Sequence, residues 1–129
     1  MTIPFTCVIA AWLLIYLPKF AASIAVSRGG SYDNNNPRDQ QAALTGWKRR
    51  ATAAHLNAFE NFAPFAAAVF VAHLGHASES LTAPLALVFV AARIAHPALY
   101  IADLASARSL AWGVGFVATF ALFLSPLLR

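Results

Sequence analysis

Charged residues are scarce in this sequence, and their scarcity excludes an ordinary soluble domain. Of its 129 residues, 11% are Asp, Glu, Lys or Arg and 60% are hydrophobic, whereas a soluble domain has about a quarter charged and about half apolar residues. A helix needs roughly 20 apolar residues to cross a lipid bilayer, so the chain has room for four crossings. We therefore expect a single all-α domain over residues 1–129, an integral membrane four-helix bundle.

Cysteine pairs and metal-ligand motifs are also missing. Cys7 is the single cysteine, so the chain cannot form an internal disulfide, and its apolar sequence neighbours favour a small buried side chain over a reactive thiol. No spacing of Cys and His predicts a metal site. The net charge is +4, but no basic run has interleaved aromatic residues, so we expect no nucleic-acid partner.

The apolar residues form four blocks, which predict helices over about 5–26, 47–74, 81–104 and 107–127. Pro18 predicts a kink in the first helix, and Ser106 is the predicted N-cap of the last. Residues 27–46 contain Gly, Asn and Pro and predict a polar loop. The N-terminal block lacks a basic start and a small-residue cleavage site, so we expect a retained helix rather than a removed signal peptide.

The basic residues predict the orientation in the membrane, because cytoplasmic loops are enriched in Lys and Arg. The first connection holds Arg28, Arg38, Lys48, Arg49 and Arg50. The third connection holds Arg108, and the second has no Lys or Arg. We therefore expect the first and third connections to face the cytoplasm and both termini to lie on the opposite side.

Polar residues interrupt two of the expected membrane helices, although a charged side chain at mid-membrane costs at least ~2.5 kcal/mol. Helix positions three, four and seven apart share a face. One stripe lies on the second helix and consists of Arg50, Asn57, Glu60 and Pro64. The other lies on the third helix and consists of Arg93, His96 and Tyr100.

Two interpretations of these stripes stay open. One is that they hold the helices together, with Glu60 and Arg93 as mutual partners; such contacts contribute only ~0.6 kcal/mol on average. The other, which we favour, is that they line a site for a polar ligand. Lys19 also has two interpretations, a side chain that extends to the membrane interface or a polar role inside the bundle.

Two segments resemble the MAPEG family, the membrane-associated proteins in eicosanoid and glutathione metabolism. They are AAHLNAFENFAPF in the second helix and ARIAHPALYIADLASARSL in the third helix and its exit. The similarity extends from Trp47 to about Trp112 and is greatest to the microsomal glutathione transferases. The loop SYDNNNPRDQQAALTGW is similar to that of bacterial members.

The resemblance implies a homotrimer in the bacterial inner membrane, with glutathione as co-substrate bound between adjacent subunits near the cytoplasmic side. The glutathione contacts that it implies are His55, Asn57, Glu60, Arg93 and Tyr100. It places Arg108 beside the glutathione sulfur as the catalytic residue. Relatives often carry an arginine two or three residues before His55, where this chain has Thr52 and Ala53; Lys48, Arg49 and Arg50 are the nearby cations that could replace it.

Glutathione has two carboxylates, an ammonium and a thiol, and the predicted residues suit each group. Arg50 and Arg93 suit the carboxylates, and Glu60 suits the ammonium. Arg108, at the predicted start of the last helix, would favour the thiolate. The thiolate would attack a hydrophobic electrophile or a lipid hydroperoxide that arrives from the bilayer.

The expected function is therefore that of a membrane-bound glutathione-dependent transferase or peroxidase. The alternative is a non-enzymatic protein of the same fold that binds glutathione or another small anionic ligand without turnover.

Overall fold

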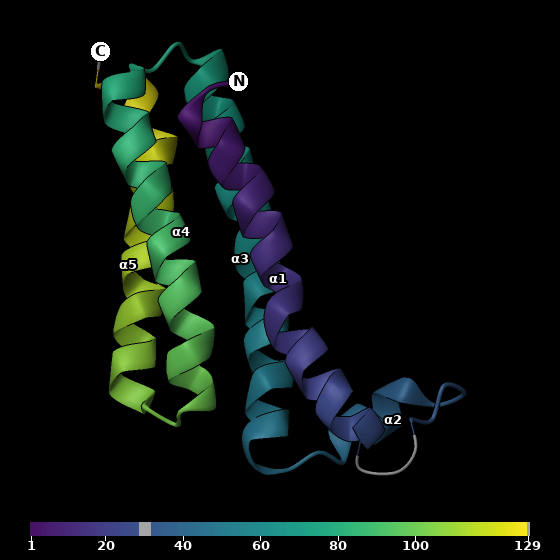
Figure 1. Ribbon diagram of the computed structural model, residues 1–129. Helices are drawn as coiled ribbons and strands as arrows, with labels where there is room; N and C mark the ends of the chain where they lie inside the picture. The colour runs from purple at the N-terminus through teal and green to yellow at the C-terminus, as the bar shows by residue number, and fades with distance from the viewer. Residues whose placement is uncertain (29–31, 129) are drawn as a thin grey trace.

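The computed structural model describes residues 1–28 and 32–128, and every element among them is helical. The four long helices are α1 (Ile3–Arg28), α3 (Gly46–Leu74), α4 (Glu79–Ile101) and α5 (Ala105–Leu124). The short helix α2 (Pro37–Ala42) lies in the first connection, and a 3-10 turn, η1 (Ser125–Leu127), follows α5 (Figure 1). The predicted all-α fold is confirmed, and each long helix begins and ends within three residues of its predicted bounds.

Successive long helices run in opposite directions, so the connections gather at two ends of the molecule (Figure 1). The N-terminus, η1 and the α3–α4 turn lie at one end. The α1–α3 connection with α2 and the α4–α5 link lie at the other. We call the latter the basic end, because it carries Arg28, Arg38, Lys48, Arg49, Arg50 and Arg108. The first and third connections thus share one end, as the charge distribution predicts.

The helices that carry the two polar stripes, α3 and α4, are the inner helices. Each packs against the three other long helices, whereas α1 and α5 pack chiefly against these two. The stacked rings of Phe65 and Phe89, 3.8 Å apart between centroids, join α3 to α4 in the core. Cys7 is buried in the same core, as predicted. His55 of α3 and Arg93 and His96 of α4 are therefore buried between helices.

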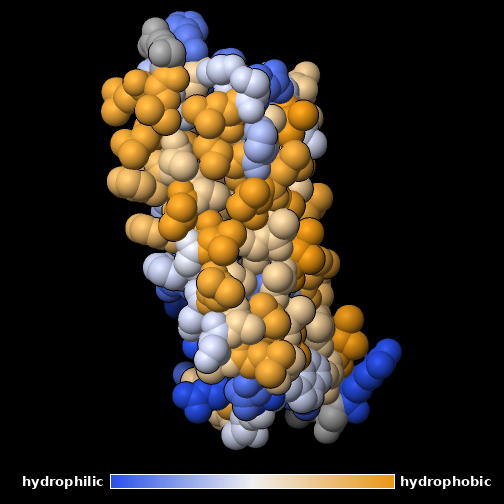
Figure 2. All heavy atoms as spheres, turned by 90° about the vertical axis from the view of Figure 1, so that its left-hand side faces the viewer, coloured by the Kyte–Doolittle hydropathy of each residue, from blue (hydrophilic) through white to orange (hydrophobic). Residues whose placement is uncertain are grey.

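Three of the described helices, α1, α4 and α5, are long and apolar enough to cross a membrane. Helix α3 has 29 residues, but basic residues in its first turns and Asn57, Glu60 and Asn61 near its middle make it less apolar. Hydrophobic side chains cover most of the face shown in Figure 2, and hydrophilic ones gather at the two ends. An exposed apolar surface of this extent is typical of a protein that contacts lipid, so the structure indicates a membrane protein.

The prediction that Ser106 caps the last helix is wrong. Helix α5 begins at Ala105 with Leu104 in the N-cap position, so Ser106 lies inside the first turn. The cause is a tight closure at the end of α4, where Asp103 has a φ of 63° and the N–H of Leu104 donates to the carbonyl of Leu99 over 3.0 Å. This left-handed termination ends α4 and starts α5 earlier in the sequence than predicted.

The polar connection predicted over residues 27–46 contains the short helix α2. Pro37 occupies its first turn, where the missing N–H and fixed φ of proline suit a helix. Residues 29–31 of the predicted loop lie outside the described residues. Helix α1 continues through Pro18 as a single element.

The contact between the α3–α4 turn and η1 tests the packing at the end opposite the basic end. A Cβ atom at Gly75 would lie 2.6 Å from the side chain of Pro126, so we expect Gly75→Ala to lower stability by about 1–3 kcal/mol, the usual cost of overpacking. Thermal unfolding in detergent measures the change. Gly113→Ala is the matched control, because a Cβ at Gly113 meets nothing within 4 Å. Equal unfolding temperatures for the two variants would contradict the contact.

Candidate functional site

A polar cleft opens between α3, α4 and α5 in the half of the molecule nearer the basic end. Its volume is about 240 Å³. The residues that line it are Asn57, His96, Tyr100, Arg108, Ser109 and Trp112. Three of the predicted site residues, Asn57, Tyr100 and Arg108, thus lie together on three different helices.

Arg93 is not part of the cleft lining but contacts the cleft residue Asn57, and it is 5% exposed. Its Nη1 donates to Oδ1 of Asn57 over 3.3 Å, and its Nη2 donates to the carbonyl of Ala111 over 3.4 Å. Its Cζ lies 5.5 Å from the centroid of the Phe89 ring. The Nε atom is buried and has no hydrogen-bond partner. Arg93 is therefore a buried cation held by neutral groups, and its Nε–H donor is unpaired.

The predicted pairing of Arg93 with Glu60 is wrong. The partners of Arg93 are Asn57 and Ala111, and the single ion pair among residues 1–28 and 32–128 joins Arg50 to Asp103. Three residues turn a helix by about 300°. Because Asn57 faces α4, Glu60 is rotated toward the exposed side of α3.

A glycine on α5 makes room for the guanidinium of Arg93. A Cβ atom at Gly115 would lie 2.8 Å from Nη2 and 3.2 Å from Nε of Arg93. Any side chain at this position would force the guanidinium to move. The backbone of α5 thus approaches Arg93 closely enough for the Ala111 carbonyl to accept its hydrogen bond.

The side chains of Tyr100 and Arg108 are stacked at the mouth of the cleft. The Cζ of Arg108 lies 4.4 Å from the centroid of the Tyr100 ring, a distance typical of a cation–π contact. The His96 ring meets the other side of this pair, edge to face with Tyr100 at 5.6 Å. Arg108 sits in the first turn of α5, where its N–H donates to the carbonyl of Leu104 over 2.9 Å. The Tyr100 ring therefore fixes the position of a guanidinium at the start of a helix.

Arg50 lies at the basic end but outside the cleft lining. Its Nε donates to the carbonyl of Ile101 over 3.1 Å, and its Nη1 lies 3.4 Å from the carboxylate of Asp103. Both partners belong to the end of α4, where a cation complements the unpaired carbonyls and the negative end of the helix dipole. Within one chain, Arg50 thus closes α4. Lys48 likewise reaches the Ala25 carbonyl of α1, at 3.5 Å.

His55 and Glu60 face away from the cleft of their own chain. The Nδ1 of His55 lies 2.7 Å from the carbonyl of Ile15 in α1, and its ring packs against Phe59. This agrees with the helical wheel, which separates His55 from Asn57. Glu60 is exposed on α3 beside Leu56 and Phe59, which are 57% and 48% exposed.

Three cleft residues are absent from the predicted set. His96 carried a signal, because it belongs to the polar stripe of α4. Ser109 and Trp112 follow Arg108 by one and four positions, and neither residue type predicts a site alone. Their position in the cleft depends on the tight α4–α5 link, because this link sets the rotation of α5.

The cleft has the electrostatics of an anion site. The guanidinium of Arg108 lines it, that of Arg93 is hydrogen-bonded to its lining residue Asn57, and the lining contains no carboxylate. Guanidinium groups bind carboxylates through charge-assisted hydrogen bonds. Among the described residues, no group of three or more His, Cys, Asp or Glu side chains could hold a metal ion.

The chain is similar to one known protein family over nearly its whole length. The family model described as MAPEG family matches residues 3–128. No curated protein and no solved structure matches the chain.

The neutral surroundings of Arg93 predict an unusual response to its removal. Replacing a buried charge by an apolar side chain of similar size is often neutral or stabilising, by up to about 4 kcal/mol. We expect Arg93→Met to unfold thermally at or above the temperature of the unsubstituted protein. Arg50→Met, which loses its partners Ile101 and Asp103, should unfold at a lower temperature. A markedly less stable Arg93→Met would show that Arg93 serves the fold rather than a ligand.

Proposed function

The chain belongs to the MAPEG family, which includes glutathione transferases and related proteins, and on that premise we propose that it is a membrane-bound glutathione transferase of the microsomal, bacterial type. The reaction joins the thiol of glutathione to hydrophobic electrophiles, or uses it to reduce lipid hydroperoxides. Glutathione binds in the cleft between α3, α4 and α5.

The observation that carries this proposal is the unneutralised pair of guanidiniums at the cleft. Arg93 is a buried cation whose partners, Asn57 and the Ala111 carbonyl, are neutral, and a ligand carboxylate in the adjoining cleft would balance its charge. A bound carboxylate also needs neutral donors, and the Asn57 amide and the Tyr100 hydroxyl line the same space. Glutathione supplies two carboxylates, so it suits a site rich in cations.

Arg108 suits the thiol of glutathione. A free thiol has a pKa of about 8.5 and is nucleophilic only as the thiolate. A guanidinium held on Tyr100, 4.4 Å from the ring centroid, favours the thiolate by its fixed charge, and the first turn of α5 adds the positive end of a helix dipole. The thiol proton leaves to solvent at the cleft mouth.

The bond changes follow from the thiolate. In the transferase reaction, the sulfur forms a bond to an electrophilic carbon and displaces its leaving group or opens its ring. In the peroxidase reaction, the sulfur bonds to the distal oxygen of the hydroperoxide, and the O–O bond breaks. The alkoxide takes a proton and leaves as the alcohol. A second glutathione then converts the sulfenic acid to glutathione disulfide and water.

The exposed face of α3 supports a homotrimer with glutathione shared between subunits. Glu60 is exposed there among Leu56 and Phe59, and a carboxylate on an apolar membrane face is costly unless it has a partner. In our proposal a neighbouring subunit covers this face, and the ammonium of its glutathione pairs with Glu60. Arg50 and His55 face α4 and α1 in their own chain. They would then support the glutathione site from the side of α3 that packs against the helices of their own chain.

The placement in the membrane follows from the basic end. Helix α3 lies alongside three apolar helices, so it would be the fourth crossing, with Asn57 facing the cleft and Glu60 covered by the neighbouring subunit. We infer a bacterial inner-membrane protein with the basic end in the cytoplasm and both termini on the other side. Glutathione would enter from the cytoplasm, and the hydrophobic substrate would enter from the bilayer.

Removal of Arg108 tests the catalytic assignment. We expect Arg108→Ala to abolish the ultraviolet absorbance of the glutathione thiolate near neutral pH, while the affinity for glutathione falls by less than about tenfold, since Arg93 still holds a carboxylate. Difference absorbance and calorimetry measure the two quantities. Arg49→Ala, which removes an exposed cation of the same end, is the control. An unchanged thiolate signal in Arg108→Ala would contradict the role. Binding without a thiolate signal in the unsubstituted protein would favour the non-enzymatic alternative.

Neutralising Glu60 tests the shared site. Glu60→Gln should weaken glutathione by about tenfold, since it loses a charge-assisted contact to the ammonium, and the thiolate absorbance at saturation should persist. The matched control is Glu79→Gln, at the opposite end, where the Glu79 carboxylate accepts the N–H of Ile3 over 3.1 Å. Unchanged glutathione affinity in Glu60→Gln would remove Glu60 from the site.

A further inference from the structure

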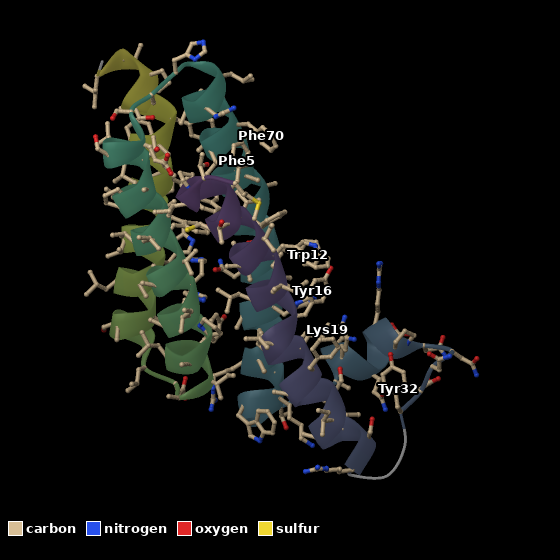
Figure 3. All side chains as sticks on the ribbon, turned by 45° about the horizontal axis from the view of Figure 1, so that its top comes forward. Phe5, Trp12, Tyr16, Lys19, Tyr32 and Phe70 are labelled. Carbon is tan, nitrogen blue, oxygen red and sulfur yellow. The ribbon has the colours of Figure 1, made fainter. Side chains whose placement is uncertain are left out.

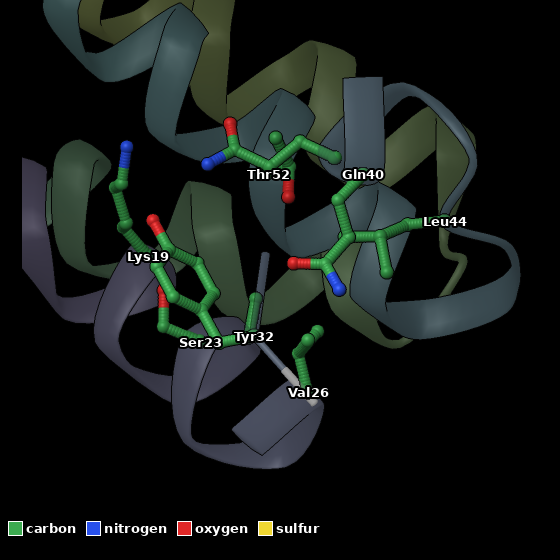
Figure 4. A pocket seen from close by; sticks show the side chains of 9 residues that line it. Lys19, Ser23, Val26, Tyr32, Gln40, Leu44 and Thr52 are labelled. Atoms are coloured by element: carbon green, nitrogen blue, oxygen red, sulfur yellow. The ribbon is translucent and has the colours of Figure 1, made fainter. Parts of the chain in front are cut away.

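A second polar pocket lies between α1, α2 and the start of α3, and it shares only α3 with the cleft. Its polar side chains are those of Lys19, Ser23, Tyr32, Gln40, Gln41 and Thr52. Figure 4 shows the side chains of Lys19, Ser23 and Tyr32 close together on one wall, with Gln40 and Leu44 of the first connection on another. Nothing in the proposed glutathione chemistry uses these residues.

Lys19 is a cation without a partner. No hydrogen bond or ion pair joins its ammonium to any other residue within 1–28 and 32–128, where the single ion pair is that of Arg50 with Asp103. It lies nine residues before the end of α1, which corresponds to roughly 14 Å at a rise of about 1.5 Å per residue. A partly buried, unpaired charge at this depth needs either water or an anion.

The part of the pocket that comes from the first connection is held in place by hydrogen bonds within that connection. The carboxylate of Asp33 accepts the N–H groups of Asn35 and Asn36 at 2.9 and 3.1 Å, and these bonds, that of Asn36 first, lower the pKa of Asp33. The N–H of Asp33 donates to the Gln40 side chain of α2 over 3.1 Å. Tyr32 therefore adjoins a hydrogen-bonded turn that stays formed at neutral pH.

An exposed apolar surface leads away from the pocket along α1. Leu13, Leu17 and Phe20 of this helix are 55%, 60% and 60% exposed. Trp12 and Tyr16 lie edge to face at 5.5 Å, and Figure 3 shows Trp12, Tyr16 and Lys19 in succession along α1, with Tyr32 beyond them. A ligand with its charge at Lys19 would thus have an apolar path toward the membrane interior.

We propose that this pocket binds the phosphate group of an anionic membrane phospholipid. The Lys19 ammonium balances the charge, and the hydroxyls of Ser23 and Tyr32 and the amide of Gln41 donate hydrogen bonds to the phosphate oxygens. The acyl chains lie against Leu17 and Phe20. A soluble anion would use the pocket but not this apolar surface, so the geometry favours a lipid. The proposal is independent of glutathione binding.

The test measures lipid binding to the purified full-length protein in an uncharged detergent without glutathione. Native mass spectrometry gives the affinities for phosphatidylglycerol and for phosphatidylcholine. We expect preference for phosphatidylglycerol, and about fivefold weaker binding in Lys19→Gln, the effect of one basic residue near an anionic membrane surface. Arg38→Gln is the matched control, because it removes the same charge from an exposed position on α2 outside the pocket; it should bind as the unsubstituted protein does.

Several results would overturn the proposal. Equal weakening in Lys19→Gln and Arg38→Gln would mean general attraction to the basic end. Displacement of the lipid by millimolar inorganic phosphate would identify a soluble anion as the ligand, and displacement by glutathione would assign the pocket to the glutathione site. If Lys19→Gln does not fold, Lys19→Arg should retain phosphatidylglycerol and Tyr32→Phe, at an exposed position, should bind it more weakly; the reverse pattern would contradict the proposal.

Discussion

The site depends on one constraint, which is the burial of the Arg93 guanidinium without a carboxylate. In an apolar surrounding an unpaired charge is costly, and it persists only where other groups supply hydrogen bonds. Asn57 from α3 and the Ala111 carbonyl from α5 supply them. Gly115 leaves the space that a side chain would fill. Groups from three helices thus surround one cation, and one of its N–H donors still has no hydrogen-bond partner.

The helix arrangement follows from the same constraint. A helix that carries Asn57, Glu60 and Asn61 and a helix that carries Arg93 and His96 cannot present all of these groups to lipid. In the structure they are the inner helices, and the apolar helices α1 and α5 flank them. The tight end of α4, with Asp103 in a left-handed conformation and Arg50 on the last carbonyls, then sets the rotation that stacks Arg108 on Tyr100. The contacts that fix the packing of the helices therefore also position the residues of the site.

Much of this was predictable from the sequence, because long apolar blocks and helical spacing depend on local chemistry. The four long helices and the polar stripes that contain Asn57 and Tyr100 follow from that spacing, whereas the place of Arg108 was implied by the resemblance to the MAPEG family. The partner of Arg93 could not be predicted from this spacing, because Asn57 and Glu60 differ by only about 60° in their direction around α3. The predicted N-cap at Ser106 was wrong because the left-handed turn at Asp103 contains no glycine, the residue that usually marks such a turn in a sequence. The pocket at Lys19 depends on Tyr32 and Gln41, which lie in a connection without periodicity.

The central claim is that a ligand carboxylate completes the site around Arg93. Calorimetry with the purified protein, comparing glutathione with its diester in which both carboxylates are neutral, tests it most directly. The account predicts saturable binding of glutathione and at least about a hundredfold weaker binding of the diester, since charge-assisted hydrogen bonds of about 1.5–3 kcal/mol each are lost. Equal affinity for the two compounds would contradict it, because the buried guanidinium would then have no part in recognition.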